Sequence, residues 1–250
     1  MRRLIRLVFS DIRRIINIRT VLACLLCFCA AAFILSKRVV PDENMPSPAD
    51  EFTARLFGGY VPELGDSIQI ELPASLLLYT GLLACGGIIT QDGLRRRGQL
   101  LMRCGSRSVL FCAQSVQSAV LAVLWNVIGA AVDMVLCLLL YGETGDIGCL
   151  MRGAGLHFSA CLLLLMLMLS LSFLSGRTAV TCFACEAVLL ICIAAGTVLP
   201  QLPFASASLR RVNAGIIDFC TGLIVNFVSA TVIFALYMPL QRLGDAREVL

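Results

Sequence analysis

Charged side chains are scarce in this sequence, and two of the charge-bearing residue types occur only once. Of its 250 residues 14% are charged, whereas a typical soluble domain has about 25%. Lys37 is the single lysine and His157 the single histidine. A P-loop needs a Gly-Lys-Ser/Thr sequence because its lysine reaches the terminal phosphates, but Lys37 stands between Ser36 and Arg38. The chain therefore does not bind ATP through a P-loop.

Hydrolase motifs are missing as well. No serine stands in a Gly-x-Ser-x-Gly sequence, and no His-Glu-x-x-His or paired-glutamate motif occurs. A lone histidine in an apolar run, such as His157, more often bonds a neighbouring helix than acts in catalysis. We therefore expect no catalytic residue, no metal and no cofactor in this chain. Its formal charge of +4 gives no reason to expect nucleic acid.

Apolar residues are abundant: 59% of the chain is hydrophobic and the mean hydropathy is +0.90. A helix of about 20 apolar residues crosses a bilayer. Six apolar runs predict spans at about residues 20–36, 72–90, 112–138, 155–175, 178–199 and 219–240. The third lies in a run of 33 residues, 109–141, which is too long for a simple crossing, so we expect it to tilt or to lie partly along the membrane surface. We predict an all-α, polytopic membrane protein with one transmembrane domain over residues 1–250.

Thirteen cysteines would suggest a disulfide framework in a small secreted protein. Most of them lie inside the apolar runs, where a free cysteine behaves as a small hydrophobic residue. Cys182 and Cys185 form a Cys-x-x-Cys sequence, but within a predicted span and without histidine partners. We expect neither disulfides nor a metal or redox site.

The N-terminal segment, residues 1–18, is predicted to be an amphipathic helix lying at the membrane interface. At 100° per residue, its arginines fall on one face and its aliphatic side chains on the other. The arginines are Arg2, Arg3, Arg6, Arg13 and Arg14, and the opposite face includes Leu4, Ile5, Val8, Phe9, Ile12, Ile15 and Ile16.

The loop at residues 37–71 carries the signals of a short helix. Ser47 followed by Pro48 is typical of a helix start, and Gly58-Gly59 is typical of a helix end. The apolar side chains between them predict that this helix docks either on the membrane or on the bundle. They are Phe52, Leu56 and Phe57.

The distribution of charge predicts the orientation. Fourteen of the twenty basic residues fall on one side of the predicted spans, and ten of the sixteen acids fall on the other. Basic residues near span ends are enriched in the cytoplasm. We therefore expect a multi-pass protein of the cell (plasma) membrane with both termini cytoplasmic, residues 91–108 in the cytoplasm and residues 37–71 outside.

Polar side chains within the apolar runs are candidate functional residues. They are Asn126, Asp133, Glu186 and Asn226. An ionisable group in the hydrocarbon is costly, so it faces a partner or water. Three interpretations stay open: a polar translocation path or proton site, hydrogen bonds that hold the helices together, or a position near a span end.

The segment at residues 91–108 is the most distinctive motif. It carries five arginines between two spans, and leucines alternate with them. This composition suits a short helix at the membrane surface, with its basic face toward solvent and its apolar face toward the bundle. Two motifs carry a resemblance to a known family. They are the run 98–107, Gly-Gln-Leu-Leu-Met-Arg-Cys-Gly-Ser-Arg, and the Phe-Gly-Gly-Tyr sequence at residues 57–60.

With residues 1–18 before the first span and residues 200–218 before the sixth, the chain resembles the permease subunit of bacterial type-2 ABC exporters. The resemblance implies a homo- or heterodimer of permeases and a separate cytosolic ABC ATPase subunit. It implies that the segment at 91–108 couples the two through Asp92, Arg95, Arg96, Arg97, Gln99, Arg103 and Arg107. The acidic loop at 37–71 is longer than in the simplest members, and nothing in the sequence selects a substrate.

Two other functions remain open from the residues alone. One is a non-transporting membrane protein, such as an immunity or accessory factor, which needs neither a polar path nor an ATPase. The other is a secondary transporter that uses Asp133 or Glu186. The sequence shows no repeated halves, which many secondary transporters have.

Overall fold

A computed structural model describes residues 16–37, 47–96, 99–100 and 106–247, with side chains up to residue 241. Within these residues there is no strand, and six helices are long and apolar enough to cross a membrane. They are α2 (Ile18–Leu35), α4 (Glu71–Arg95), α6 (Arg107–Tyr141), α7 (Ile147–Ser175), α8 (Thr178–Ala195) and α10 (Phe219–Arg247). The prediction of an all-α, six-span membrane protein is confirmed. The predicted interfacial helix at 1–18 lies almost wholly outside the described residues.

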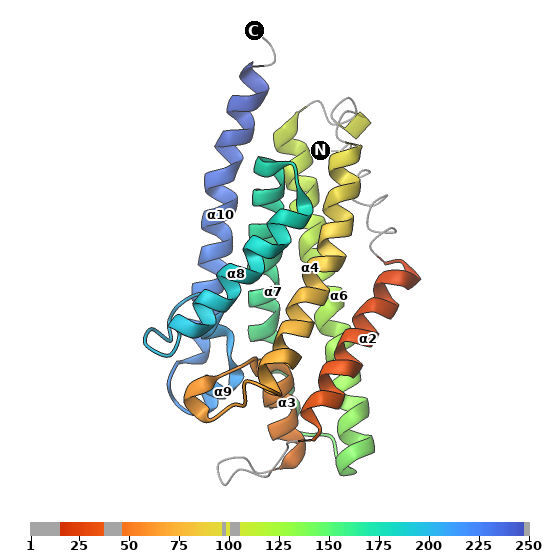
Figure 1. The fold of residues 1–250 in the computed structure, drawn as a ribbon, viewed down its shortest axis with the longest axis vertical. Helices are drawn as coiled ribbons and strands as arrows, with labels where there is room; N and C mark the ends of the chain where they lie inside the picture. Colours follow the sequence, from red (N-terminus) through yellow and green to blue (C-terminus); the bar gives the residue numbers. More distant parts are fainter. Residues whose placement is uncertain (1–15, 38–46, 97–98, 101–105, 248–250) are drawn as a thin grey trace.

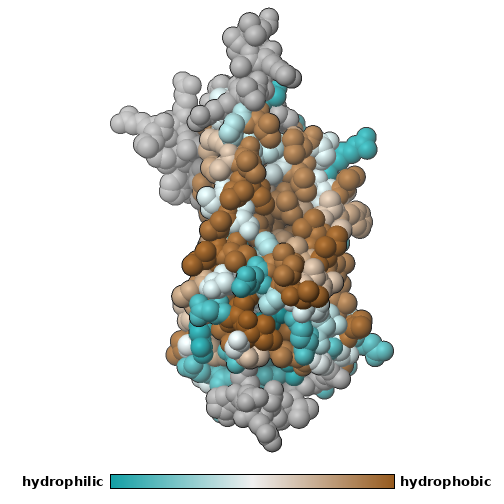
Figure 2. All heavy atoms as spheres, turned by 90° about the vertical axis from the view of Figure 1, so that its left-hand side faces the viewer, coloured by the Kyte–Doolittle hydropathy of each residue, from teal (hydrophilic) through white to brown (hydrophobic). Residues whose placement is uncertain are grey.

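The six long helices run alternately in opposite directions, with α7 in the middle of the bundle (Figure 1). In the most apolar stretch of α7, 67% of the residues are buried, against 22% in α8 and 17% in α10. The side chains that α8 and α10 turn outward are still apolar, among them Phe183, Ile191, Ile224 and Leu236. Hydrophobic side chains cover most of the length of one face in Figure 2, and hydrophilic ones gather near its lower end. This is the surface of a protein whose solvent at mid-height is lipid.

Local signals in the sequence set the ends of these helices. The Ser106 hydroxyl accepts a hydrogen bond from the Val109 N–H and begins α6. The Asp146 carboxylate accepts from the N–H groups of Gly148 and Cys149 and begins α7. Gly142 and Gly176 follow the last turns of these helices with φ of 75° and 65°. A backbone in the left-handed region favours glycine, so both helices end where the sequence supplies one.

The helix boundaries differ from the predicted spans where charged residues continue a helix. The helix α4 runs on from its apolar part through Asp92 to Arg95, so the start of the arginine-rich segment is its last turn. The helix α6 is continuous over 35 residues, with no separate surface turn.

The short helix predicted in the loop after the first span is α3 (Pro48–Gly58). Its start is as predicted, since the Ser47 hydroxyl accepts the Asp50 N–H at 3.1 Å. Its position is on the bundle and not on the membrane, because Phe52, Leu56 and Phe57 are at most 1% exposed. Three more short elements gather near α3: η1 (Pro62–Leu64), η2 (Ala205–Ala207) and α9 (Leu209–Asn213).

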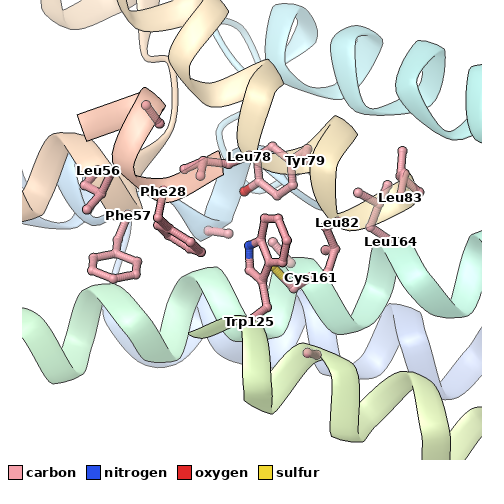
Figure 3. Close-up of a cluster of buried hydrophobic side chains, with 14 of the residues drawn as sticks. Phe28, Leu56, Phe57, Leu78, Tyr79, Leu82, Leu83, Trp125, Cys161 and Leu164 are labelled. Carbon is pink, nitrogen blue, oxygen red and sulfur yellow. The ribbon is translucent and has the colours of Figure 1, made fainter. Parts of the chain in front are cut away.

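Close packing between α2, α4, α6 and α7 builds the core (Figure 3). The ring of Phe28 on α2 lies 5.3 Å from that of Trp125 on α6 and 6.3 Å from that of Phe57 on α3. A methyl group at Gly129 would stand 2.5 Å from the Phe28 ring. Small residues let membrane helices approach this closely, and the gain is van der Waals contact.

The bundle has two unlike ends, which we name here. The arginine end is where α4 stops, α6 begins and α7 joins α8; it holds Arg95, Arg96, Arg107 and Arg177. The capped end is the opposite one, where α3, η1, η2 and α9 lie over the helix ends.

Candidate functional site

The polar residue Asn126 joins α6 to α7. Its side-chain oxygen lies 2.9 Å from His157 Nδ1, and its amide donates to the Ala122 carbonyl in its own helix at 2.8 Å. Both side chains are buried, and the His157 ring packs against those of Phe57 and Tyr79. His157 therefore has the role expected of a lone histidine in a membrane helix, which is to bond a neighbouring helix.

Asp133 binds α6 to the short helix α3. Its Oδ2 accepts a hydrogen bond from the Thr53 hydroxyl at 2.9 Å, and the residue is 2% exposed. The Cys137 thiol, one turn further along, donates to the Ala49 carbonyl. Asp133 thus lies near the capped end of its helix and makes an inter-element hydrogen bond there, which combines two of the interpretations left open above.

Asn226 on α10 holds the segment that precedes that helix. Its side-chain oxygen accepts the Phe204 N–H at 3.0 Å, and its amide donates to the Ser206 hydroxyl at 3.1 Å. Phe204 has a φ of 64° and a ψ of −47°, a sparsely populated conformation that costs about 1–3 kcal/mol. The buried Asn226 therefore stabilises an unfavourable turn that brings η2 into the bundle.

Glu186 differs from the other three intramembrane polar residues. It lies near the middle of α8 and is half-buried. Within the described part of the chain its carboxylate makes no hydrogen bond or ion pair. Of the two acids predicted to lie in apolar stretches, only Asp133 is satisfied by a neighbouring element.

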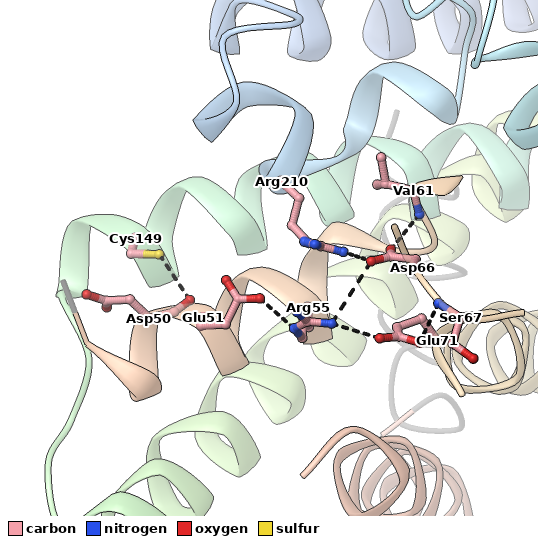
Figure 4. A network of polar contacts seen from close by, with 9 residues as sticks. All are labelled: Asp50, Glu51, Arg55, Val61, Asp66, Ser67, Glu71, Cys149 and Arg210. Carbon is pink, nitrogen blue, oxygen red and sulfur yellow. Dashed lines mark hydrogen bonds and ion pairs between the residues drawn. The ribbon is translucent and has the colours of Figure 1, made fainter. Parts of the chain in front are cut away.

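The capped end contains a buried ionic network that sequence reasoning did not identify (Figure 4). Arg55 on α3 is at its centre: its guanidinium lies 2.5 Å from Glu51, 2.7 Å from Glu71 and 4.0 Å from Asp66. Glu51 and Glu71 are 2% and 3% exposed. Buried carboxylates persist when they are paired and hydrogen-bonded, so Arg55 ties α3 to the start of α4.

Two consecutive arginines extend this network to the segment before α10. Arg210 pairs with Asp66, whose other oxygen accepts the Val61 N–H at 2.7 Å. Arg211, 1% exposed, lies 2.7 Å from Glu63 and donates to the Ala205 carbonyl at 2.6 Å. A signal for this was present in the sequence: the excess of acids at 37–71 needs basic partners on the same side, and Arg210-Arg211 is a basic pair there.

The arginine end presents the predicted coupling residues very differently. Asp92 and Arg96 form an ion pair of 3.0 Å one turn apart, and each side chain is 44% exposed. Arg95 and Gln99 are exposed, and Arg107 is half-buried in the first turn of α6. Arg97 and Arg103 lie outside the described residues. The described members thus lie together at this end of the bundle, mostly facing away from it.

The connection between α4 and α6 is packed against the helices at both of its ends. A methyl group at Gly93 would come within 1.8 Å of the Gln114 side chain, so the last turns of α4 touch the first turns of α6. Leu94 and Leu100 pack on a cluster from α6, α7 and α10 that includes Phe111, Phe173 and Tyr237. Leu94 and Leu100 therefore face the bundle while Arg95 and Arg96 face outward, as the alternation in the sequence predicts.

A cleft of about 500 Å³ opens beside this connection. Its walls come from the last turns of α4 and from the turn between α7 and α8. The lining residues are Gln91, Leu94, Arg95, Gly176, Arg177, Thr178, Ala179 and Val180. No acid is among them.

Neither the side-chain clusters nor comparison with other proteins assigns a chemistry to these sites. Across the described ranges, no three His, Cys, Asp or Glu side chains come together as a metal centre requires. The cysteines there are free. No family model, curated protein or solved structure matches this chain.

Proposed function

We propose that this chain is the membrane-spanning permease subunit of an ATP-driven bacterial exporter, and that it works as a pair of permeases with a separate cytosolic ATPase. The observation that carries the proposal is the connection between α4 and α6. Arg95 and Arg96 at its start are exposed, while its two ends are the ends of two membrane helices that touch at Gly93 and Gln114.

This geometry suits the transfer of motion from a partner to the spans. Because α4 is helical as far as Arg95, a force on the exposed turn acts on α4 without an intervening flexible linker. Leu94 and Leu100 add a contact with α6, α7 and α10. A rigid-body displacement of the connection thus reorients several spans at once, because closely packed helices move together.

The proposal places the arginine end in the cytoplasm, because short loops rich in arginine face that side. The ATPase is a separate chain because this one has no P-loop. An acidic surface on that ATPase complements the exposed arginines and speeds its association.

The test replaces Arg95, Arg96 and Arg97 together by Ala in a tagged chain expressed in its own cell. Membranes are solubilised in a mild detergent, and vanadate-sensitive ATP hydrolysis that co-purifies with the chain is measured. We expect wild type to retain it and the triple variant to lose about 90% of it, since each lost arginine removes a charged contact. Membrane insertion and orientation, mapped first with terminal reporters, stay unchanged.

Two exposed arginines outside the connection supply matched controls. Arg19→Ala and Arg152→Ala each remove a charge, at the start of α2 and of α7, and leave ATP hydrolysis at the wild-type level. A triple variant that still binds and stimulates the ATPase overturns the coupling assignment.

The same preparation distinguishes the proposed exporter subunit from the alternative, a secondary transporter. Asp133→Asn keeps an oxygen for the Thr53 hydroxyl, and Glu186→Gln removes a charge without a described partner. Both variants retain ATP hydrolysis if the proposal holds. Transport that needs no ATP and is lost in these variants would replace the proposal with the alternative.

A further inference from the structure

The cleft beside the α4–α6 connection has a polar and an apolar part. Arg95 and Gln91 on α4 face Arg177 and Thr178 across an opening of about 500 Å³. Leu94, Ala179 and Val180 form the rest of the wall. A space of this size holds the head of an amphipathic molecule rather than a single ion.

The two arginines give the cleft a positive charge, and no acid is among its described lining residues. The nearby acid, Asp92, is bonded to Arg96 at 3.0 Å. Within the described residues, neither Arg95 nor Arg177 forms an ion pair. Guanidinium groups bind phosphate oxygens with two parallel hydrogen bonds, and the Thr178 hydroxyl adds a further donor.

An apolar stripe runs from the cleft along the outward face of α8. Val180, Phe183 and Ile191 lie three and eight residues apart on one side of the helix and are 57%, 74% and 65% exposed. The cleft lies where α8 begins and α4 stops, at the end of both membrane spans, which is the level of the lipid headgroups. A ligand that fits both parts carries a negative head and hydrocarbon chains.

We propose that this cleft binds the phosphate of an anionic glycerophospholipid from the adjoining leaflet, with its acyl chains along α8. Basic pockets between membrane helices recognise anionic headgroups in this way. The site does not depend on the exporter assignment, because it involves neither ATP nor a second protein.

The test measures phospholipid binding to the purified full-length chain without any ATPase. The chain is delipidated in detergent and titrated with fluorescent phosphatidylglycerol against an excess of phosphatidylcholine. Wild type is expected to bind one phosphatidylglycerol saturably. The double variant Arg95→Gln/Arg177→Gln is expected to bind about 10-fold more weakly, since two charges near the membrane surface are lost.

Controls keep the result specific to the cleft. Arg19→Gln and Arg152→Gln each remove an exposed arginine elsewhere and leave the affinity unchanged. The elution volume and melting temperature of the double variant show that it is folded. Rescue by Arg95→Lys/Arg177→Lys is partial, since lysine keeps the charge without the two-pronged geometry.

Three outcomes overturn the proposal. The double variant binds phosphatidylglycerol as tightly as wild type, or phosphatidylcholine competes on equal terms. In the third, inorganic phosphate at equal concentration displaces the lipid, which makes the cleft a site for free anions and leaves the acyl chains without a role.

Discussion

The two ends of the bundle use the same residue type in opposite ways. At the capped end, Arg210 and Arg211 are 7% and 1% exposed and pair with acids from η1 and the loop that follows it. At the arginine end, Arg95 and Arg96 face outward, and the ion pair of Arg96 is with its own helix. The buried arginines bind one part of this chain to another, whereas the exposed arginines can contact another molecule.

The difference follows from the cost of desolvation. Removing a guanidinium and a carboxylate from water costs several kcal/mol, which is offset only by close pairing and further hydrogen bonds. Asp66 meets that requirement through Arg210, Arg55 and the Val61 N–H. An exposed pair such as Asp92–Arg96 contributes little to stability. The capped end is thus held by its buried charges, whereas the exposed Asp92–Arg96 pair adds little to the stability of the arginine end.

The largest effect is expected from Asp66→Ala at the capped end. The substitution removes the buried carboxylate that pairs with Arg210 and accepts the Val61 N–H. Breaking a buried pair on one side costs about 3–5 kcal/mol. The expected result is a large fall in the melting temperature of the detergent-solubilised chain. This temperature is measured by size-exclusion chromatography of samples heated to increasing temperatures. Glu143→Ala, which removes an exposed acid from the same end, leaves it unchanged; equal melting temperatures for the two variants would contradict a structural role for the network.

An intermediate effect is expected from Asn226→Leu. The variant keeps the volume but removes the acceptor of the buried Phe204 N–H, at a cost of about 1–3 kcal/mol. The loss of stability is measured by titrating the variant and the wild type with a denaturing detergent and comparing their unfolding midpoints. Thr231→Val is the matched control on the same helix, because its exposed hydroxyl bonds only the Phe227 carbonyl of α10. A loss no larger than that of the control would show that the turn at Phe204 does not need Asn226.

The smallest effect on stability is expected from Arg96→Ala at the arginine end. Its pair with Asp92 is 44% exposed on both sides, and such pairs contribute about 0.3–0.5 kcal/mol. The same melting assay should show a shift close to its error. A fall in melting temperature comparable to that of Asp66→Ala would remove the contrast between the two ends. It would mean that ion pairs stabilise the arginine end as much as the capped end.

The sequence predicts the six spans well because an uncharged run of about 20 residues has few alternatives in a membrane. It also predicts α3, since Ser47, Pro48 and Gly59 act through local backbone geometry. It could not decide whether α3 docks on the membrane or on the bundle. That choice depends on Phe57 and Phe28 packing together, and this contact involves a second helix that periodicity does not describe.

The partners within the ionic network could not be predicted from the sequence for a related reason. Arg211 and Glu63 are 148 residues apart in the chain, and Arg210 and Asp66 are 144 apart. From the local sequence alone, either arginine could equally well contact solvent, a lipid headgroup or an acidic side chain. Only the folding of η1 and α9 onto the same end of the bundle selects one of these.

The length of α6 has a mechanical consequence. At 1.5 Å per residue its 35 residues extend about 52 Å, well beyond a hydrocarbon layer of about 30 Å. Gln114 touches α4 near one end of this rod, and Asp133 bonds α3 near the other. The two contacts lie about 28 Å apart along the helix axis by the same rise. Because the helix is continuous between them, a tilt of α6 at the arginine end also displaces α3 at the opposite surface.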